Sequence, residues 1–530
     1  MIFRLLYSTP QNSCRVRITH RIIKSFKLND LVRGTHPTYY CRILLGSLKP
    51  TNHLLHHQKI MKILILGSGQ VGSAIAHELA AMSNHDITLI DTDEHALRLV
   101  SNHLDVQTIV GNGASPILME QAGAKDTDML LALTRSDETN LVACKIAADF
   151  FNIPNRIARV RSTDYLEYGE PSSDEDDQIS GCLNAFGITD SIHPEQLVTE
   201  HLAGLLNYVR ALQVLPFAHD KVKMVIAQAK SYDQIKHKNI QEINADLPEH
   251  TDCQICAIYR NNRLLVPNPD TRIEEGDEIC FIVNSLHLEA VMRSMFQYDN
   301  SRRRVMIAGG GNIGYRLAKQ LENKFNIKLI ENSHQRAEWL AENLDNTLVL
   351  QGSASDENLL SREYIDEIDV FCAITNDDEN NIMSALLAKN LGAKRVISII
   401  NRSRYVDLIT GNQIDIVVSP HLITIGSVLA HVRRGDIAAV YPLRRGAAEA
   451  IEVVVHGDEK TSVLVGRKIS DIKFPTGCHI AAIVRDEEVI MGRNHDHILQ
   501  ENDHLIFFVA RRRVLQELEK LIQVKMGFFG

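Results

Sequence analysis

The sequence predicts an α/β protein with two doubly wound parallel sheets, each followed by a small α+β domain. Two observations lead to this prediction. A long internal repeat divides the chain after residue 60 into two similar halves. Within each half, apolar strand-like runs first alternate with amphipathic helical segments and then give way to shorter strands. A chain of 530 residues is also too long for a single core.

The repeat is carried by two segments that return about 240 residues further on. The segment 63–72 (ILILGSGQVG) returns at 305–314 (VMIAGGGNIG), and 134–140 (TRSDETN) returns at 375–381 (TNDDENN). Both pairs match without a gap. The two halves therefore have the same element order.

The elements of the first half follow one another in strict alternation. The run at 63–66 is wholly apolar, as a strand buried on both faces of a parallel sheet should be. Further strands are expected at 86–90, 106–110, 129–133 and 156–160, with helices at 71–82, 93–103, 115–122 and 138–150 between them. Such alternation is typical of a doubly wound sheet.

A second kind of unit follows each parallel sheet. Residues 239–243 match 468–472, and Glu-Gly-Asp at 275–277 matches Glu-Asn-Asp at 501–503. These units have short strands, turn signals and one expected helix each, which favours α+β domains. We expect parallel-sheet domains at 61–185 and 302–425 and α+β domains at 200–297 and 438–524.

Charge is unevenly distributed along the chain. Residues 1–60 contain ten Lys or Arg and one acid, whereas the whole chain has a net charge of −9. The remaining body is therefore acidic, which argues against nucleic-acid binding. The basic leader has the composition of a transit peptide, or it is an upstream extension of the reading frame with Met61 as the true start; we favour the second interpretation. In either case we expect 1–60 to be disordered or absent from the native protein.

Two further classes of site are disfavoured. No run of 18 apolar residues occurs, so we expect no direct membrane insertion, and a membrane role would require a partner. Cys253 and Cys256 lie inside an apolar strand-like run without a second ligand pair at suitable spacing, so no metal site is expected.

A glycine motif follows the first strand. Gly67 allows a tight turn, Gly69 lets a pyrophosphate approach the backbone, and Gly72 lets the helix pack on the strand. The helix N-terminus then offers free amides to phosphate. Asp91 ends the second strand, where an acid accepts the ribose hydroxyls and would repel a 2′-phosphate. These features indicate a Rossmann-like site that takes NAD or ATP rather than NADP.

The second half keeps the same constellation in Gly309, Gly311, Gly314 and Glu331, which argues for a second site. Loss of these determinants would be expected if the second copy served packing alone.

Further residues are expected beside each nucleotide site. Thr134 and Thr375 end the fourth strand, at the carboxyl edge where such sheets bind ligands. Arg159 lies on the fifth strand; it could meet phosphate or form a salt bridge to a neighbouring helix. Its counterpart is Ser398, so the two sites are not equivalent.

Longer segments carry a family resemblance. They are 61–72, 136–144, 154–159, 309–314 and 381–389, together with Thr375–Glu379. Over about 470 residues from Met61, the chain resembles the TrkA family, the regulatory subunits of bacterial Trk potassium-uptake systems. That family has two tandem RCK domains, each with a Rossmann half and a C-terminal ligand-sensing half.

The resemblance and the glycine motifs together give an expected set of nucleotide-binding residues. In the first half these are Gly67, Ser68, Gly69, Gln70, Val71, Gly72, Asp91, Thr134, Arg135 and Arg159; in the second half they are Gly309, Gly310, Gly311, Asn312, Ile313, Gly314, Glu331, Thr375 and Asn376. The resemblance implies NAD(H) as ligand, with ATP or ADP as further ligands.

The resemblance also implies an assembly and a location. Family members form a homotetrameric ring beneath an integral-membrane potassium-translocating subunit and gate potassium uptake as peripheral, cytoplasmic proteins on the inner face of the inner membrane. This role is regulatory and not enzymatic. Two features depart from the pattern. Gln70 and Asn312 occupy positions where some single-RCK relatives have an arginine. The leader 1–60 and the acidic loop 170–177 have no counterpart in the family pattern.

The main alternative is an NAD-dependent oxidoreductase. Tyr232 and Lys236 have the Tyr-x-x-x-Lys spacing of short-chain dehydrogenases, but they lie in the first α+β unit and the second unit lacks them. A third hypothesis is a scaffold that has lost ligand binding; the retained acids Asp91 and Glu331 speak against it.

Overall fold

The computed structural model describes a defined part of the chain. The described residues are 61–81, 85–168, 181–208, 210–297, 303–402, 405, 409, 413–432, 437–443, 448–492, 496–511 and 514–522. The leader 1–60 and the acidic loop 170–177 lie outside the described residues. Among the described residues, no helix is both long and apolar enough to cross a membrane.

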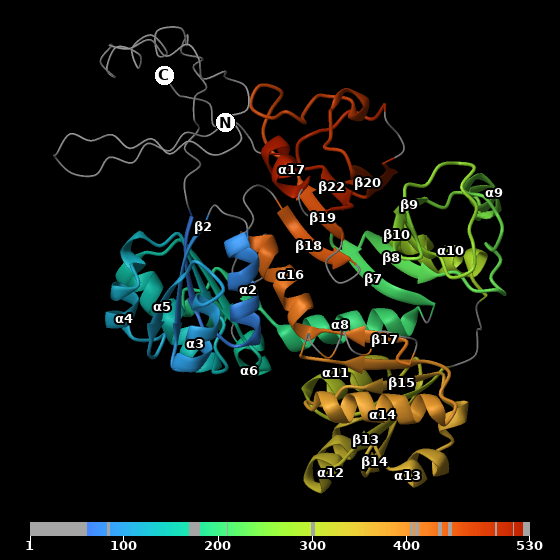
Figure 1. Ribbon diagram of the computed structural model, residues 1–530, viewed down its shortest axis with the longest axis horizontal. Helices are drawn as coiled ribbons and strands as arrows, with labels where there is room; N and C mark the ends of the chain where they lie inside the picture. Colours follow the sequence, from blue (N-terminus) through green and yellow to red (C-terminus); the bar gives the residue numbers. More distant parts are fainter. Residues whose placement is uncertain are drawn as a thin grey trace, which may run out of the picture. The chain divides into compact units, whose positions relative to one another are not determined.

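The first half opens with a six-stranded sheet in the order β3-β2-β1-β4-β5-β6, parallel throughout (Figure 1). Its strands are β1 Met61–Leu66, β2 His85–Asp91, β3 Gln107–Val110, β4 Met129–Ala132, β5 Asn155–Arg159 and β6 Asp190–Ile192. Its helices are α2 Gln70–Ala81, α3 Glu94–Ser101, α4 Pro116–Gln121, α5 Asp137–Phe151, α6 Thr163–Glu167 and α7 Gly181–Ala185. The doubly wound sheet predicted from the alternation of elements is confirmed. The sixth strand was not predicted because three residues give too short a pattern.

The second half repeats this topology in the order β14-β13-β12-β15-β16-β17. Its strands are β12 Arg304–Ala308, β13 Asn326–Glu331, β14 Thr347–Gln351, β15 Val370–Ala373, β16 Val396–Ile399 and β17 Ile416–Val418. Its helices are α11 Asn312–Leu321, α12 His334–Asn343, α13 Glu357–Arg362 and α14 Asp378–Asn390. The buried central strands are apolar in both halves, so parallel pairing buries both faces.

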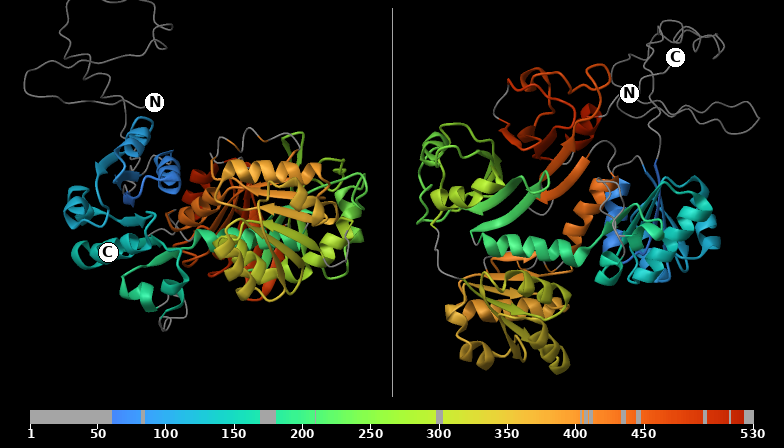
Figure 2. Two further views of the ribbon diagram at one scale, coloured as in Figure 1. Left: turned by 90° about the horizontal axis from the view of Figure 1, so that it is seen from below. Right: turned by 180° about the vertical axis from the view of Figure 1, so that it is seen from behind.

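Each parallel sheet is followed by a five-stranded antiparallel sheet, in the orders β10-β9-β11-β8-β7 and β18-β19-β22-β20-β21 (Figure 2). The strands are β7 Ala211–Phe217, β8 Val222–Gln228, β9 Cys253–Arg260, β10 Arg263–Leu265, β11 Glu278–Asn284, β18 Ile437–Leu443, β19 Ala448–Val454, β20 Cys478–Arg485, β21 Glu488–Met491 and β22 His504–Val509. The helices are α9 Ile240–Asp246, α10 Leu288–Met295 and α17 Leu515–Ile522. The two sheets share one core, in which Met224 and Cys280 pack with Ala450 and Phe508.

The expectation of one helix in each α+β unit is wrong for the first unit, which has α9 and α10. The reason is local. Asn239 and Glu242 form a reciprocal capping box that starts α9. The matching segment of the second unit has Lys468 at this position, without a side-chain cap, and forms only a 3-10 turn, Ile469–Asp471.

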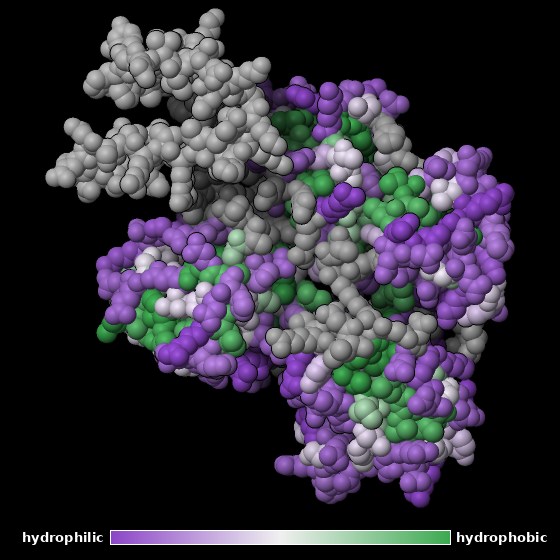
Figure 3. Space-filling view, in the orientation of Figure 1, coloured by the Kyte–Doolittle hydropathy of each residue, from purple (hydrophilic) through white to green (hydrophobic). Residues whose placement is uncertain are grey.

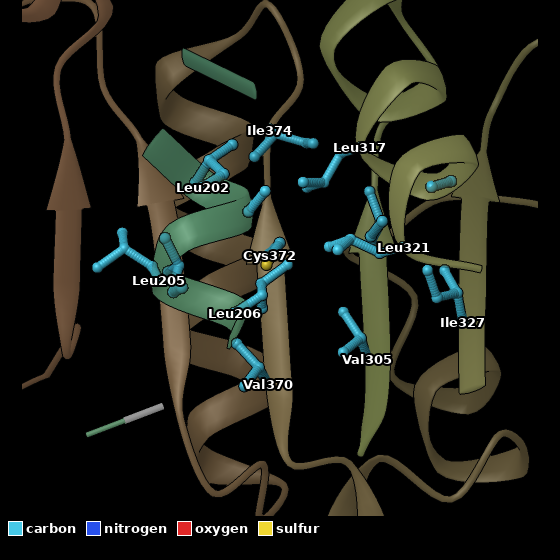
Figure 4. Packing of buried hydrophobic residues seen from close by; sticks show 14 of the residues in the cluster. Leu202, Leu205, Leu206, Val305, Leu317, Leu321, Ile327, Val370, Cys372 and Ile374 are labelled. Atoms are coloured by element: carbon cyan, nitrogen blue, oxygen red, sulfur yellow. The ribbon is translucent and has the colours of Figure 1, made fainter. Parts of the chain in front are cut away.

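Two linking helices are exchanged between the halves. Helix α8 Pro194–Asn207 follows the first parallel sheet, yet its Leu202, Leu205 and Leu206 face the second sheet (Figure 4). Helix α16 Pro420–Val432 follows the second sheet, yet its Val428 and Leu429 belong to the core of the first sheet. The core of each parallel sheet therefore includes a helix from the other half.

Candidate functional site

The glycine turns have the geometry that their residues require. Gly67 has φ +100°, and a Cβ there would lie 3.1 Å from the backbone of Leu133. A Cβ on Gly72 would lie 1.9 Å from the carbonyl oxygen of Gly67, so helix α2 can approach the turn only with glycine here. Gly309, with φ +115°, and Gly314 repeat both features in the second half. A Cβ on Gly69 would meet nothing within 4 Å, which leaves the phosphate side of the first turn open.

The acid at the end of the second strand holds each glycine turn. The Ser68 amide donates to Asp91 Oδ2 at 2.5 Å, and the Asp93 amide donates to Oδ1 at 2.8 Å. In the second half, the Gly310 amide donates to Glu331 Oε2 at 2.8 Å. Burial alone would raise the pKa of Asp91, but the amides of Asp93 and Ser68 outweigh it and hold that pKa below its ordinary value. The carboxylate is therefore ionised and fixed at the mouth of the cleft.

A buried asparagine anchors the threonine at the end of the fourth strand. The amide and hydroxyl of Thr134 donate to Asn140 Oδ1 at 3.0 and 2.7 Å, and Asn140 Nδ2 donates to the Arg159 carbonyl at 2.8 Å. Asn381 makes the same bonds to Thr375 and to the carbonyl of Ile399. Sequence reasoning missed both asparagines as functional residues. The signal was available, because the repeat keeps Thr and Asn six residues apart in both halves.

A cavity of about 970 Å³ lies at the carboxyl edge of the first sheet. Most of the residues expected to bind nucleotide in the first half line it, namely Gly67, Gly69, Gln70, Val71, Asp91, Thr134, Arg135 and Arg159. Ser68 and Gly72 do not; Ser68 is buried and Gly72 contacts the turn. The second half also contributes to the lining, with Asn376, Asp377, Asp378, Glu379, Asn401, Arg402, Pro420, His421 and Thr424. Asn376, expected at the second site, thus faces the first cleft.

The arginines of this cavity differ in their partners. Arg159 makes no side-chain hydrogen bond or ion pair among the described residues, and its buried Nε lacks a hydrogen-bond partner. Arg161 Nη2 donates to the carbonyl of Arg135 at 2.9 Å, and its Nε lies 3.9 Å from Glu195 Oε1 in α8. The helix-directed ion pair considered for Arg159 is therefore made by Arg161. Burial and then the like charge of Arg161 lower the pKa of Arg159, and the negative charges of Glu195 and Asp137 offset this only in part.

The second cleft is arranged differently. Arg336 Nε donates to the carbonyl of Gly310 at 2.8 Å, and its guanidinium carbon lies 4.1 Å from the centre of the Trp339 ring. The equivalent position in the first half is Ala96, which lines the cavity there. A second cavity of about 860 Å³ is lined by Asn312, Tyr315, Arg316, Arg336 and Trp339 together with residues of the first half. Neither cavity is lined by Gly309, Gly310, Gly311, Ile313, Gly314, Glu331 or Thr375.

The pair considered for oxidoreductase chemistry lines neither cavity. The hydroxyl of Tyr232 accepts from Arg210 Nη1 at 3.3 Å, and Lys236 Nζ lies 3.2 Å from Glu275 Oε2. Cys253 and Cys256 are buried and form no disulfide with another described cysteine. Within the described ranges, no group of three or more His, Cys, Asp or Glu side chains could hold a metal ion.

The fold and the clefts define a tandem protein in which a Rossmann-like domain and an antiparallel domain occur twice. Known proteins share this organisation. The TrkA-N domain model matches residues 63–172 and 305–420, and the TrkA-C domain model matches 230–295 and 458–523. The chain belongs to the TrkA family.

Individual relatives are similar over almost their full length. The Trk system potassium uptake protein TrkA of Halomonas elongata is 45% identical over 469 residues, which cover 88% of this chain and 100% of that protein. The protein of the same name from Vibrio alginolyticus is 45% identical over 464 residues, with 87% and 99% covered. Among solved structures, the GsuK RCK domain superposes with a TM-score of 0.55 at 17% identity, covering 88% of this chain and 96% of that one. This last similarity concerns the fold.

Proposed function

We propose that this protein is the regulatory subunit of a Trk-type potassium-uptake system, and that a nucleotide in the first cleft sets the activity of a membrane potassium-translocating subunit. One observation carries the proposal. The cavity beside Gly67 and Arg159 is also lined by Asn376 and Arg402 of the second half. A ligand there contacts both halves, so its binding energy depends on how the halves are arranged.

The proposed ligands are NAD(H), ATP and ADP. The amides at the start of α2 and the unpartnered Arg159 suit phosphate, and Asp91 suits ribose hydroxyls. The ionised Asp91 would repel a 2′-phosphate, which disfavours NADP. A GsuK channel, which shares this fold, has been solved bound to NAD.

We propose that the nucleotide is sensed and not turned over. Tyr232 and Lys236, the pair that an oxidoreductase would need, are held by Arg210 and Glu275 and line neither cavity. The Trk-system names of the relatives agree with a regulatory role.

The proposed assembly is a homotetramer, attached peripherally to its membrane subunit on the cytoplasmic face of the inner membrane. Equivalent helices of the two halves expose apolar side chains: Val142 is 44% and Phe150 72% exposed on α5, and Met383 is 61% exposed on α14. Figure 3 shows apolar residues gathered over α14. Side chains of this kind are suited to contacts between subunits.

The test is reconstitution of the purified chain with a Trk membrane subunit in potassium-loaded vesicles. We expect NADH, ATP or ADP to change the potassium flux while the nucleotide is recovered intact. Flux that ignores every nucleotide, or hydride transfer or ATP hydrolysis in step with flux, would contradict the proposal. Asp91→Ala is the matched variant, since it removes the ribose acceptor without touching the arginines.

A further inference from the structure

Helix α16 of the second half connects two places in the first half. Residues near its start line the first cleft, namely Pro420, His421 and Thr424. Its last turn carries His431, whose Nε2 lies 3.3 Å from Oδ1 of Asp190 on β6. The apolar face between these two ends packs in the core of the first sheet. One helix therefore lines the cleft at its start and meets a carboxylate of the first half at its end.

The repeat has apolar residues at the corresponding place in the other linking helix. Counted from the proline that begins each helix, Leu205 of α8 corresponds to His431 of α16. Counted from the start of each strand, Ile416 of β17 corresponds to Asp190 of β6. Leu205 and Ile416 both belong to the apolar core of the second sheet. Of the two exchanged helices, only α16 has a titratable pair at this place.

Both ring nitrogens of His431 face hydrogen-bond acceptors. Nδ1 lies 2.8 Å from the carbonyl oxygen of Ser427, and Nε2 faces the Asp190 carboxylate. A neutral imidazole carries one N–H and can satisfy only one of these acceptors, whereas the protonated ring donates to both. The contact between α16 and β6 is therefore built for the charged form of His431.

Other titratable groups lie on the elements packed against α16, which are α2, α8, β6 and β18. Besides Asp190 they are His77 and Glu78 on α2, Glu195, Glu200 and His201 on α8, and Tyr441 on β18, and α16 itself carries His421. Burial alone would lower the pKa of His431, but the hydrogen bond to Asp190 and its charge, and then the Ser427 carbonyl, raise that pKa above its ordinary value. Among the described residues, Asp190 is the charged group that acts on His431.

The direction of the pH effect follows from this raised pKa. The pair is complete below the ordinary histidine pKa of about 6.5 and is lost as pH rises through the higher folded-state value. The loss therefore occurs close to neutral pH, where histidine is the side chain that ordinarily changes charge.

We infer that protonation of His431 increases the affinity of the first cleft for nucleotide, with α16 as the connecting element. The inference rests on the nucleotide binding proposed above. Protonated His431 fixes the end of α16 to β6, and this holds the start of the helix in the cleft lining. Neutral His431 releases the last turn, so a nucleotide must then order the helix at the expense of its own binding energy.

The coupling is reciprocal because two ligands of one protein must affect each other equally. If a proton on His431 tightens nucleotide binding, a bound nucleotide must raise the pKa of His431 further. The chain then responds to pH and to nucleotide together, through one helix.

The test is calorimetry of the full chain with NAD, comparing wild type with His431→Gln at about pH 6 and about pH 8.5. NAD is the probe because its pyrophosphate lacks the terminal phosphate group that titrates near pH 6 in ATP. Wild type should bind about threefold more tightly than the variant at the lower pH, as expected for a partly exposed ion pair, and equally at the higher pH. Comparison at one pH removes the contribution of His421, which both proteins retain.

A second variant copies the other linking helix. His431→Leu combined with Asp190→Ile introduces the residues found at the corresponding place of α8 and β17. An apolar pair holds the helix at every pH, so this variant should match wild type at the lower pH and bind NAD about threefold more tightly at the higher pH. His103→Gln, an exposed histidine just beyond α3, is the control and should match wild type at both.

A separate readout is the NMR titration of His431, identified by its absence in His431→Gln. Bound NAD should raise the pKa of this histidine. A pKa that NAD leaves unchanged overturns the coupling, as does a ratio of wild-type to His431→Gln affinity that is the same at both pH values or larger at the higher one. In these cases nucleotide binding itself stands.

Failure of the proposed function gives a different result. A wild-type chain that binds none of NAD, ATP and ADP refutes that function and this inference with it. If ATP binds and NAD does not, the same ratios are measured with ATP, because its own titration cancels between two proteins at one pH. Melting curves without ligand identify a variant that fails to fold, and Asp190→Asn, which also removes the charge pair, then replaces it.

Discussion

Arg336 donates a hydrogen bond from Nε to the carbonyl oxygen of Gly310 at 2.8 Å, inside the second glycine turn. Its guanidinium stacks on Trp339, 4.1 Å from the ring centre. In the first half the equivalent position is Ala96, whose small side chain lines the cavity and does not cover the first glycine turn. The two halves have the same topology and the same acid-to-turn hydrogen bond, but Arg336 in place of Ala96, like Ser398 in place of Arg159, makes their clefts unequal.

Arg336→Ala should therefore open the second cleft. Removing the guanidinium frees the Gly310 carbonyl and the space beside it, so we expect tighter nucleotide binding at the second half. The measurement is calorimetric stoichiometry in an Asp91→Ala background, in which binding to the first cleft is weakened. Arg362→Ala, an exposed charge on α13, is the control. An unchanged binding isotherm would show that Arg336 does not limit nucleotide access to the second cleft.

Asp91→Ala should weaken nucleotide binding at the first cleft about tenfold or more, because charge-assisted hydrogen bonds contribute roughly 1.5–3 kcal/mol each. The free chain should also lose stability, since the Ser68 and Asp93 amides lose their acceptor. Glu331→Ala is the matched change in the second half. Glu331→Ala should lower the melting temperature by a similar amount, but it should reduce nucleotide affinity less than Asp91→Ala does. Equal affinity losses in both variants would contradict the inequality of the clefts.

Asn140→Ala should destabilise the first parallel domain by about 1–3 kcal/mol, because it leaves the partly buried amide of Thr134 and the Arg159 carbonyl without their partner. Thr134 and Arg159 line the cleft, so nucleotide affinity should fall as well. Asn381→Ala removes the same bonds in the second half and should reduce stability alone. Denaturant unfolding and calorimetry measure the two effects separately. Full affinity in Asn140→Ala would remove any positioning role for this asparagine.

The sequence was sufficient for features that depend on local pattern. The apolar strands, the glycine turns and the spacing to Asp91 and Glu331 are all short-range signals, and the parallel sheets follow from their alternation. The exchange of α8 and α16 was not predictable. An apolar stripe on a helix shows that Leu205 or Val428 is buried, but not against which sheet.

The same limit applies to the clefts. Asn376 was assigned to the second site because the repeat places it there, yet it lines the cavity of the first. Arg402 carries no motif, and only the packing of the two halves brings it into the lining of the first cleft. Arg336 could have been noticed as the counterpart of Ala96, but its hydrogen bond to Gly310 depends on its rotamer.

His431 and Asp190 join the exchanged helix α16 to strand β6, with Nε2 3.3 Å from Oδ1. Burial alone would lower the pKa of His431, but the bond to Asp190, and then the carbonyl of Ser427, raise it above its ordinary value. A raised folded-state pKa means that the pair stabilises the protein fully below the unfolded pKa of about 6.5. That contribution is lost as pH rises through the higher folded-state pKa.

His431→Ala should therefore cost stability at about pH 5.5 and little at about pH 8.5. The measurement is the difference in unfolding free energy between wild type and variant across that range. Asp190→Asn should remove the same pH-dependent difference, and the double variant should add nothing to it, because a shared interaction is lost only once. A difference that grows with pH, or that is additive in the double variant, would mean that the contact between α16 and β6 is not held by this pair.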